Sequence, residues 1–356
     1  MPTLIQPLPS GPLAIVGDVH GEIEALDALL RRLDALPGPR RTLVFVGDLI
    51  DRGPDSVAVV DRVAALVASG RACAIAGNHE LNLLAGERKE GNGWYFGDGD
   101  DGAWVEAVGR EVSFGSRVAD EAERARVRAF CASLPLALER HDLRVVHAAW
   151  RETAAAALPP EADLAALDAR FDVGVRARLD AAGLHAAAVA ERAQWAGLRK
   201  RPIEPPAMLA AVQAVDLAEQ NDNPIKVLTS GLEEPIAAGA RYYVGGKWRY
   251  VQRSRWWRVS PPDRPTVVGH YWRSRVVRPP GLADVWDGVG PFAWEGNTFC
   301  VDYSVGRRYA ERARGPVGEG GFRAGLAALL WPEAALCFDD REGLVPTEAA
   351  PAGAAG

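Results

Sequence analysis

The sequence predicts an α/β fold in which strands and helices alternate along the first 80 residues. Short apolar runs at 13–16, 42–46 and 73–76 are each followed by a glycine. Apolar residues at helical spacing fill the segments between them, over 22–36 and 56–68. This alternation is typical of a parallel sheet with helices on its faces. Further strand-like runs late in the chain indicate that sheet structure continues beyond this first unit.

The amino-acid composition is typical of a globular protein and does not indicate a membrane protein. The 356 residues are 48% hydrophobic and 25% charged, which is ordinary for a globular protein. The formal net charge of −6 does not favour nucleic acid as a partner, and we expect no stable nucleic-acid complex. No apolar stretch approaches the roughly 18 residues that span a bilayer, and the N-terminus does not resemble a signal peptide. Four scattered cysteines without a CxxC pair favour a cytoplasmic location.

Two segments in the middle of the chain are expected to be insertions. Residues 86–117 are rich in glycine and charge but also carry aromatic residues, and so long an irregular segment is usually functional. We therefore expect it near the active site. Residues 118–133 predict a helix, and 136–147 predict a hairpin with its turn at 141–142. Residues 154–220 are alanine-rich, which favours a helical insertion or cap.

The rest of the chain is expected to complete a single domain over residues 11–346. Its last part contains strand-like runs at 226–229, 241–252, 266–269, 298–301 and 335–338. Residues 347–356, rich in alanine and glycine, predict a disordered tail.

Polar side chains that can bind metal follow five of the strand-like runs. In open α/β sheets, ligand sites gather at the carboxyl ends of the strands, so we expect these side chains to meet. Four of the six histidines of the chain belong to this set. Its members are Asp18, His20, Asp48, Asn78, His79, His147 and His270.

These residue types favour a centre with two divalent cations. A bridging carboxylate can hold two such ions about 3.5–4 Å apart, and imidazole with oxygen ligands suits manganese, iron, nickel or zinc. Two cations can lower the pKa of a shared water from about 15.7 toward 7 and stabilise charge that builds on a phosphate. The glycines before the ligand segments allow sharp turns and close approach of a phosphate. They are Gly17, Gly47, Gly77 and Gly269.

Three sequence motifs resemble a known family. GDVHG, GDLIDRGPDS and GNHE, in this order and spacing within residues 17–80, are similar to the calcineurin-like metallophosphoesterases, in particular to bacterial and phage PPP-type phosphatases. The resemblance implies a four-layer αββα sandwich, with two mixed sheets between helices and with the two insertions at 86–117 and 154–220. It also implies two divalent metal ions as cofactors, with manganese favoured and iron, zinc or nickel as alternatives.

The resemblance also implies roles for single residues. It assigns six of them to two metal sites: Asp18 and His20 to the first, Asp48 to both as a bridge, and Asn78, His147 and His270 to the second. His79 would be the general acid that protonates the leaving oxygen, oriented by Asp51. Arg52 would bind the phosphate through its planar guanidinium. Asp302, in TFCVDYSVG, is either a group that supports this site or an ordinary turn residue.

Departures from the family pattern leave the substrate open. Ala76 stands before GNHE where protein phosphatases usually carry arginine, the context of His147 lacks the usual glycines, and the SAPNY loop of the eukaryotic enzymes is absent. Asp51, by contrast, is usually missing from symmetrical diadenosine tetraphosphatases. We predict hydrolysis of phosphate monoesters, with phosphoserine or phosphothreonine in protein as one substrate class. The alternatives are a dinucleoside polyphosphate hydrolase, a phosphodiesterase and an inactive binding protein. Expected partners are a phosphoprotein, a small phosphoester or a nucleotide.

A basic segment surrounds His270. Residues 241–278 hold ten arginines and lysines against one acid, Asp263, with four tryptophans interleaved. Two interpretations remain open for this segment. It recruits a polyanionic substrate, or it is a solvated hairpin whose tryptophans belong to the core.

Overall fold

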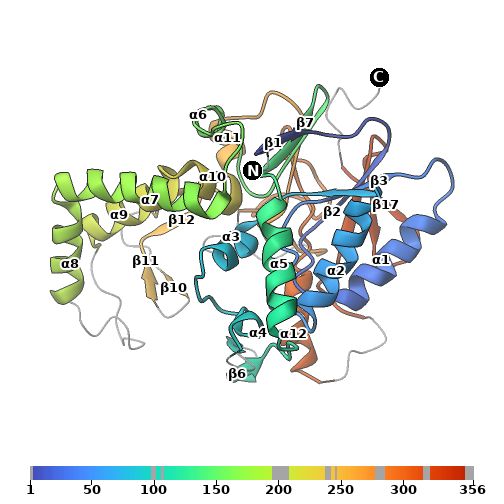
Figure 1. The fold of residues 1–356 in the computed structure, drawn as a ribbon, viewed down its shortest axis with the longest axis horizontal. Coiled ribbons are helices and arrows are strands. Elements are labelled where there is room, and N and C mark those ends of the chain that lie inside the picture. The colour runs from blue at the N-terminus through green and yellow to red at the C-terminus, as the bar shows by residue number, and fades with distance from the viewer. Residues whose placement is uncertain are drawn as a thin grey trace.

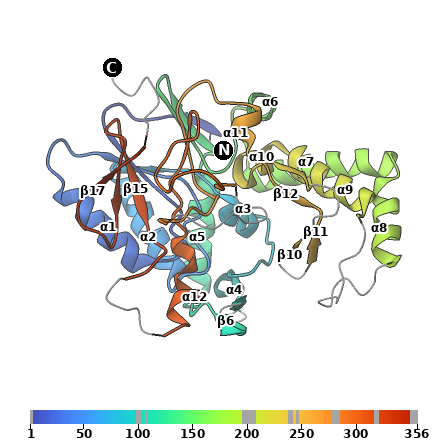
Figure 2. The ribbon, with the colours of Figure 1, turned by 180° about the vertical axis from the view of Figure 1, so that it is seen from behind.

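A computed structural model describes residues 3–97, 102–105, 108–194, 208–236, 242–244, 247–276, 285–315 and 321–348. It shows a mixed α/β fold built around two sheets (Figure 1). Helices α7, α8 and α9 project from one side of this body, as the view from behind also shows (Figure 2). None of the described helices is long and apolar enough to cross a membrane.

The first sheet has six strands in the order β17-β16-β15-β2-β3-β4. Its strands β2, β3 and β4 are parallel, as the alternation of strands and helices predicts. The late strands β15, β16 and β17 extend it by antiparallel pairing onto β2. The six strands are β2 (Leu13–Val16), β3 (Thr42–Phe45), β4 (Ala72–Ala74), β15 (Ala327–Trp331), β16 (Ala335–Phe338) and β17 (Leu344–Pro346).

The second sheet has five strands in the order β1-β7-β8-β13-β14 and is also mixed. Strands β7 and β8 form the predicted antiparallel hairpin, while β8, β13 and β14 run parallel to one another. Its strands are β1 (Ile5–Pro7), β7 (Ala137–Arg140), β8 (Leu143–Val146), β13 (Thr266–Val268) and β14 (Thr298–Cys300).

The two sheets pack face to face. Because side chains alternate along a strand, Leu13 and Ile15 of β2 point into a core shared with Val145 and Val267 of the second sheet. The intervening residues of β2, such as Val16, belong to a second apolar cluster with the helices. The predicted four-layer sandwich is therefore confirmed.

Helices cover both outer faces. Those over the first sheet are α1 (Ile23–Ala35), α2 (Ser56–Ala68) and α5 (Glu121–Ser133), and those over the second are α6 (Glu152–Ala156) and α10 (Pro224–Ser230). Asp55 caps α2 by accepting a hydrogen bond from the backbone of Ala58. Asp120 and Glu123 form a capping box that starts α5 three residues later than predicted.

The two segments expected to be insertions contain structure of their own. The first holds α4 (Gly93–Phe96) and a hairpin of β5 (Gly102–Val105) and β6 (Arg110–Ser113). The second holds α7 (Leu164–Ala181), α8 (Leu184–Gln194) and α9 (Ala210–Asn221), which share a small apolar core. The boundaries of the domain and of both insertions stay predictions, and the tail beyond residue 348 lies outside the described residues.

Two late segments differ from their sequence-based expectation. Residues 226–229, expected as a strand, lie in helix α10, because Asn223 caps it and Pro224 occupies its first position. Residues 241–252, expected as one strand-like run, contain β10 (Tyr242–Val244), β11 (Lys247–Arg249) and the start of β12 (Val251–Arg253). Strand β12 pairs with β9 (Glu233–Pro235), and helix α11 (Trp256–Val259) follows it.

Candidate metal centre

All seven metal-capable side chains lie at the ends of strands, at one edge of the sandwich. Asp18 and His20 follow β2, Asp48 follows β3, and Asn78 and His79 begin helix α3 (Asn78–Leu84) directly after β4. His147 and His270 follow the adjacent parallel strands β8 and β13 of the second sheet. The structure thus brings the predicted residues together, and the roles given to each of them remain predictions.

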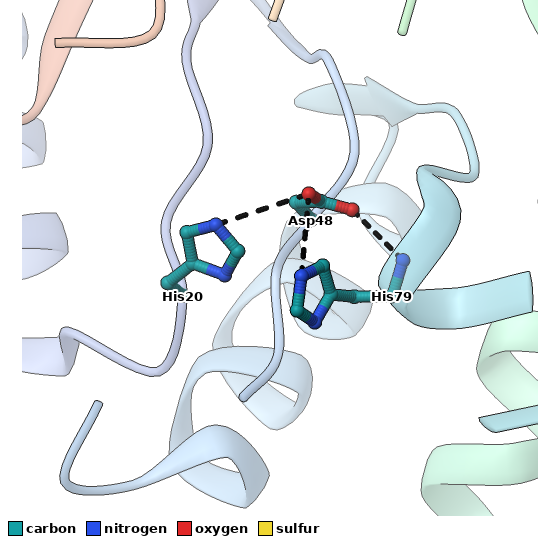
Figure 3. Close-up of side chains that lie close together, drawn as sticks. All are labelled: His20, Asp48 and His79. Atoms are coloured by element: carbon teal, nitrogen blue, oxygen red, sulfur yellow. Dashed lines mark hydrogen bonds and ion pairs between the residues drawn. The ribbon is translucent and has the colours of Figure 1, made fainter. Parts of the chain in front are cut away.

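Asp48 is at the middle of the cluster. Its Oδ2 lies 3.3 Å from Nε2 of His147, 3.8 Å from Nε2 of His20 and 3.9 Å from Nε2 of His79. Its Oδ1 accepts a hydrogen bond of 3.0 Å from the backbone N–H of His79 (Figure 3). Two groups of potential ligands share this carboxylate, one with His20 and His79 and the other with His147 and His270.

Hydrogen bonds to backbone carbonyls fix the tautomers of two histidines. Nδ1 of His20 lies 3.0 Å from the carbonyl of Ile50, and Nδ1 of His147 lies 2.7 Å from that of Val46. A carbonyl only accepts, so each Nδ1 carries the proton and each Nε2 is the nitrogen left for a metal ion. In the structure, Nε2 of His20 accepts a hydrogen bond of 3.1 Å from Arg52. Nε2 of His147 is buried and makes no hydrogen bond to a described residue. A cation between these nitrogen atoms and the central carboxylate would satisfy both.

The pKa shifts of the buried acids and of His147 indicate that positive charge is favourable at this site. Burial, together with Asp302 and Asp48 nearby, raises the pKa of Asp18 well above its ordinary value. Burial opposes ionisation of Asp48 too, but His147 and His79 hold the pKa of that carboxyl well below its usual range. Burial alone would lower the pKa of His147, but the negative charge of Asp48 outweighs burial and raises this pKa to about 10. A positive charge beside Asp48 is therefore strongly stabilised.

Two other histidines of the cluster, His20 and His270, favour the neutral form, which is the form that can bind a metal ion. Burial and the positive charge of Arg52 lower the pKa of His20 well below its ordinary value. Burial and Arg253 do the same for His270. Nδ1 of His270 also lies 2.9 Å from Oδ1 of Asn78, which brings that amide to the same side of the cluster. These neutral rings and the amide oxygen suit first-row divalent cations.

Several residues around the site have a left-handed backbone conformation, which is unfavourable for residues other than glycine. Seven non-glycine residues have a positive φ among the described residues, and five of them are predicted site residues. Their φ values are 47° at His20, 48° at Asp48, 76° at Asp51, 66° at Arg52 and 64° at His270. Left-handed residues outside glycine cost free energy and gather at functional sites. This clustering is independent support for the site.

Two glycines make the close packing of the carboxylates feasible. A Cβ on Gly77 would meet Oδ1 of Asp48 at 2.2 Å, and a Cβ on Gly269 would meet Oδ1 of Asp18 at 2.1 Å. Any larger residue at these positions would therefore displace the carboxylates. The predicted need for glycine before the ligand segments thus has a specific steric cause here.

A hydrogen-bonded chain leads from His79 into the first inserted segment. Nδ1 of His79 lies 2.6 Å from Oδ2 of Asp51, and Oδ1 of Asp51 accepts a hydrogen bond of 2.7 Å from the indole N–H of Trp94. Asp51 and Trp94 are buried. Asp51 therefore contacts His79 as expected, while Trp94 was not among the predicted site residues.

Two other buried acids support the centre. Glu80 accepts hydrogen bonds from the backbone N–H groups of Asp48, Leu49 and Gly77 at 2.8–2.9 Å, which fixes the loop that carries the central carboxylate. GNHE places this residue where a capping-box acid belongs, a signal that sequence reasoning missed. Asp302 is 1% exposed and raises the pKa of Asp18. Its position favours the supporting role over the ordinary turn.

Much of the basic segment 241–278 is structural. Four of its arginines pair with carboxylates: Arg249 with Glu233, Arg258 with Glu295, Arg264 with Asp263, and Arg275 with Asp340. Trp256 and Trp257 are buried in the core. Arg241 and Arg278 lie outside the described residues. These contacts do not support recruitment of a substrate by the whole segment. Arg253 donates a hydrogen bond to the carbonyl of His270, beside the centre.

Comparison with known proteins gives partial matches. A family model described as calcineurin-like phosphoesterase matches residues 11–126. The symmetrical bis(5'-nucleosyl)-tetraphosphatase of Janthinobacterium sp. (strain Marseille) is 47% identical over 70 residues, which are 20% of this chain and 24% of that protein. The protein of the same name from Ralstonia nicotianae is 46% identical over 79 residues, or 21% and 26% of the two chains. The chain thus spans about a quarter of the length of these curated relatives.

A solved structure with wider coverage is that of a cold-active protein-tyrosine phosphatase from a psychrophilic Shewanella species. It covers 94% of this chain and 81% of its own, at 14% sequence identity and a TM-score of 0.43.

Proposed function

We propose that this protein is a metal-dependent hydrolase of phosphate esters, because a family model described as calcineurin-like phosphoesterase matches residues 11–126. The observation that carries the proposal is the carboxylate of Asp48, which two groups of buried potential ligands share. A shared carboxylate between two such groups is the arrangement that a pair of divalent cations needs. The centre lies where the strands of both sheets end, so a substrate would reach it from that edge.

The proposed ligands divide between two metal ions. Asp18 and His20 would hold the first, Asn78, His147 and His270 the second, and Asp48 both. When bound, divalent cations supply Lewis acidity that activates water and offsets charge on the phosphate. Manganese is favoured, because imidazole with carboxylate and amide oxygens suits it and no cysteine belongs to the set; iron, zinc or nickel remain alternatives.

We propose that His79 is the general acid. Its Nδ1 is held by Asp51, so the ring can keep a proton on Nε2 and give it to the leaving oxygen. The carboxylate of Asp51 stabilises the imidazolium and fixes the orientation of the ring. Arg52 would bind two phosphate oxygens through its guanidinium, which lies 3.1 Å from Nε2 of His20 at the edge of the centre.

Trp94 is then a positioning residue, which gives a testable expectation. Trp94→Phe keeps an aromatic ring but removes the hydrogen bond to Asp51, so His79 loses orientation. We expect kcat to fall about tenfold, the worth of one hydrogen bond to a charged group, with metal content unchanged. The loss should be larger for alkyl than for nitrophenyl phosphates, because alkoxide leaving groups need protonation. The control is Tyr95→Phe. A uniform loss, or a loss of metal, would contradict the positioning role.

Two substrate classes have specific support. Phosphate monoesters, including phosphoserine and phosphothreonine, are our first proposal, because Asp51 is present and contacts His79. Dinucleoside polyphosphates are the second, because relatives named symmetrical bis(5'-nucleosyl)-tetraphosphatase share 46–47% of residues with part of this chain.

Turnover of three substrates by the manganese-loaded protein separates these functions. The substrates are a phosphoserine peptide, diadenosine tetraphosphate and a bis-aryl phosphate diester. The first proposal expects kcat/KM to be highest for the peptide and lowest for the diester. Preference for diadenosine tetraphosphate would favour the second proposal, and preference for the diester a phosphodiesterase. If an aryl phosphate is not hydrolysed with manganese, iron, zinc or nickel either, the proposed enzyme activity is wrong.

We also propose a cytoplasmic location. All four cysteines lie in the described ranges and are free thiols, three of them buried. Chains in oxidising compartments commonly pair their cysteines, whereas reducing compartments keep them as thiols. The free thiols therefore support the cytoplasm, and fractionation of the source cells would test it.

A further inference from the structure

One more acid, Asp302, reaches the edge of the sandwich at which the metal centre lies. It comes two residues after the end of β14, and β14 runs parallel to β13 with Val268 paired to Cys300. His270 follows β13 by the same two residues, so Asp302 and His270 occupy corresponding positions beyond neighbouring strands. The rule that ligand sites gather at the carboxyl ends of strands therefore applies to Asp302 as well.

The backbone of Asp302 packs against the segment that carries Asp18. A Cβ on Gly17 would meet the carbonyl oxygen of Val301 at 2.4 Å and Cα of Asp302 at 3.4 Å. On the other side, the backbone N–H of Val301 donates at 2.8 Å to the last carbonyl of β13. Asp302 is thus fixed between the segments that carry Asp18 and His270, two of the proposed metal ligands.

The two oxygens of the Asp302 carboxyl group have different surroundings. Oδ1 accepts a hydrogen bond of 2.7 Å from the backbone N–H of Ser304, which stabilises the turn after β14. Oδ2 is buried and makes no hydrogen bond to a described residue. A buried carboxylate oxygen without a partner is unfavourable. The turn does not explain this arrangement, because asparagine would accept the same hydrogen bond without burying a charge.

The electrostatic neighbours of Asp302 belong to the metal centre. Burial and, after it, the charge of Asp302 raise the pKa of Asp18, while burial and the charge of Asp48 raise the pKa of Asp302. Three buried carboxyl groups therefore act on one another, and like charges in such a place are unfavourable without a cation. A divalent cation held by Asp18 would offset them, and the negative charge of Asp302 would in turn stabilise that cation.

We propose that Asp302 supports the first metal site, where its carboxylate strengthens the binding of the cation held by Asp18, His20 and Asp48. It is a positioning residue, because Asp18 and not Asp302 is the ligand. The first site then has three carboxylates and one imidazole, an oxygen-rich environment that suits manganese. The inference rests on the proposed function, because it needs a cation at this site.

The test separates the charge of Asp302 from its place in the turn. Asp302→Asn keeps an acceptor for the N–H of Ser304 and removes only the negative charge. Manganese would be titrated into the chelator-treated full chain, and free manganese would be measured by electron paramagnetic resonance. We expect one of the two ions to bind about tenfold more weakly in the variant, the usual effect of losing a group that supports a ligand. The affinity for the other ion should be unchanged.

Asp339→Asn is the matched control for the loss of a buried carboxylate. Asp339 is 6% exposed and accepts a hydrogen bond from a backbone N–H, as Asp302 does, but it pairs with Arg308. We expect this control to lower the melting temperature of the metal-free protein without changing the affinity for either manganese ion. Asp302→Ser also keeps an acceptor for the turn, and it replaces Asp302→Asn in the titration if the asparagine variant does not fold.

Two results would overturn the role of Asp302. One is wild-type affinity for both manganese ions in Asp302→Asn, which would make Asp302 a turn residue only. The other is an equal weakening of both ions, which would indicate a general effect on the centre rather than on the first site. If the wild type binds no manganese and does not hydrolyse an aryl phosphate, the proposed function is wrong and this inference with it. Hydrolysis by a wild type that binds two ions, with no effect of Asp302→Asn, defeats only the role of Asp302.

Discussion

Asp48→Asn is expected to remove at least one metal ion and to lower the rate of phosphate-ester hydrolysis on the order of 10³-fold or more. The substitution removes one negative charge from the group that lies within 3.9 Å of three histidine Nε2 atoms. Two cations would then lose the charge that holds them together. The fold should remain, because asparagine tolerates the φ of 48° and can still accept the hydrogen bond from His79. Elemental analysis and an aryl phosphate assay measure the two effects.

The matched control for this prediction is Asp34→Asn, on the exposed end of α1. Asp34 makes only surface ion pairs with Arg40 and Arg71, and such pairs contribute little. The control should keep full metal content and activity. If Asp48→Asn retains two metals and turns over at a nearly normal rate, the bridging assignment is wrong.

His79→Ala is expected to lower the rate by roughly 10²–10⁴, the usual contribution of general acid catalysis, while metal content stays unchanged. The test also decides between two roles, because Nε2 of His79 lies close enough to Asp48 for His79 to be a metal ligand instead. If His79 is a metal ligand, its substitution should lower the metal content, whereas the loss of a general acid should leave the metal content unchanged. The rate loss should also shrink for nitrophenyl phosphates, whose leaving groups are stable without a proton.

His141→Ala serves as the control for His79, because its side chain is 92% exposed at the turn between β7 and β8. Loss of a metal from the His79 variant would make His79 a ligand. An equal rate loss for alkyl and nitrophenyl esters would remove its role as the acid. Either result would leave Asp51 and Trp94 without the function proposed for them.

The first strands and helices and the strand-end side chains were predictable because local patterns specify them, whereas the four-layer arrangement was implied by the family resemblance. Residues 13–16 and 42–46 are apolar runs of strand length, and 56–68 has helical periodicity with a capping aspartate before it. Strand β15 was missed, because Ala and Leu dominate 327–331 and fit a helix equally well. Its pairing with β2 joins residues 312–318 positions apart, and no local pattern specifies such a partner.

The outer parts of the site could not be predicted for a related reason. Trp94 reaches Asp51 because of the path taken by the first inserted segment. This contact has no signature in residue spacing. The chemistry of a metal centre, by contrast, limits its ligands to a few residue types at strand ends, and these can be recognised in one sequence.

The central claim is a two-metal hydrolytic centre, and a metal titration of the stripped protein tests it most directly. Chelator-treated protein would receive manganese in steps while bound metal and hydrolysis of an aryl phosphate are measured together. The account predicts no hydrolysis without metal, and activity that rises until two manganese ions are bound per chain. Hydrolysis by the stripped protein, or full activity with a single bound ion, would contradict it.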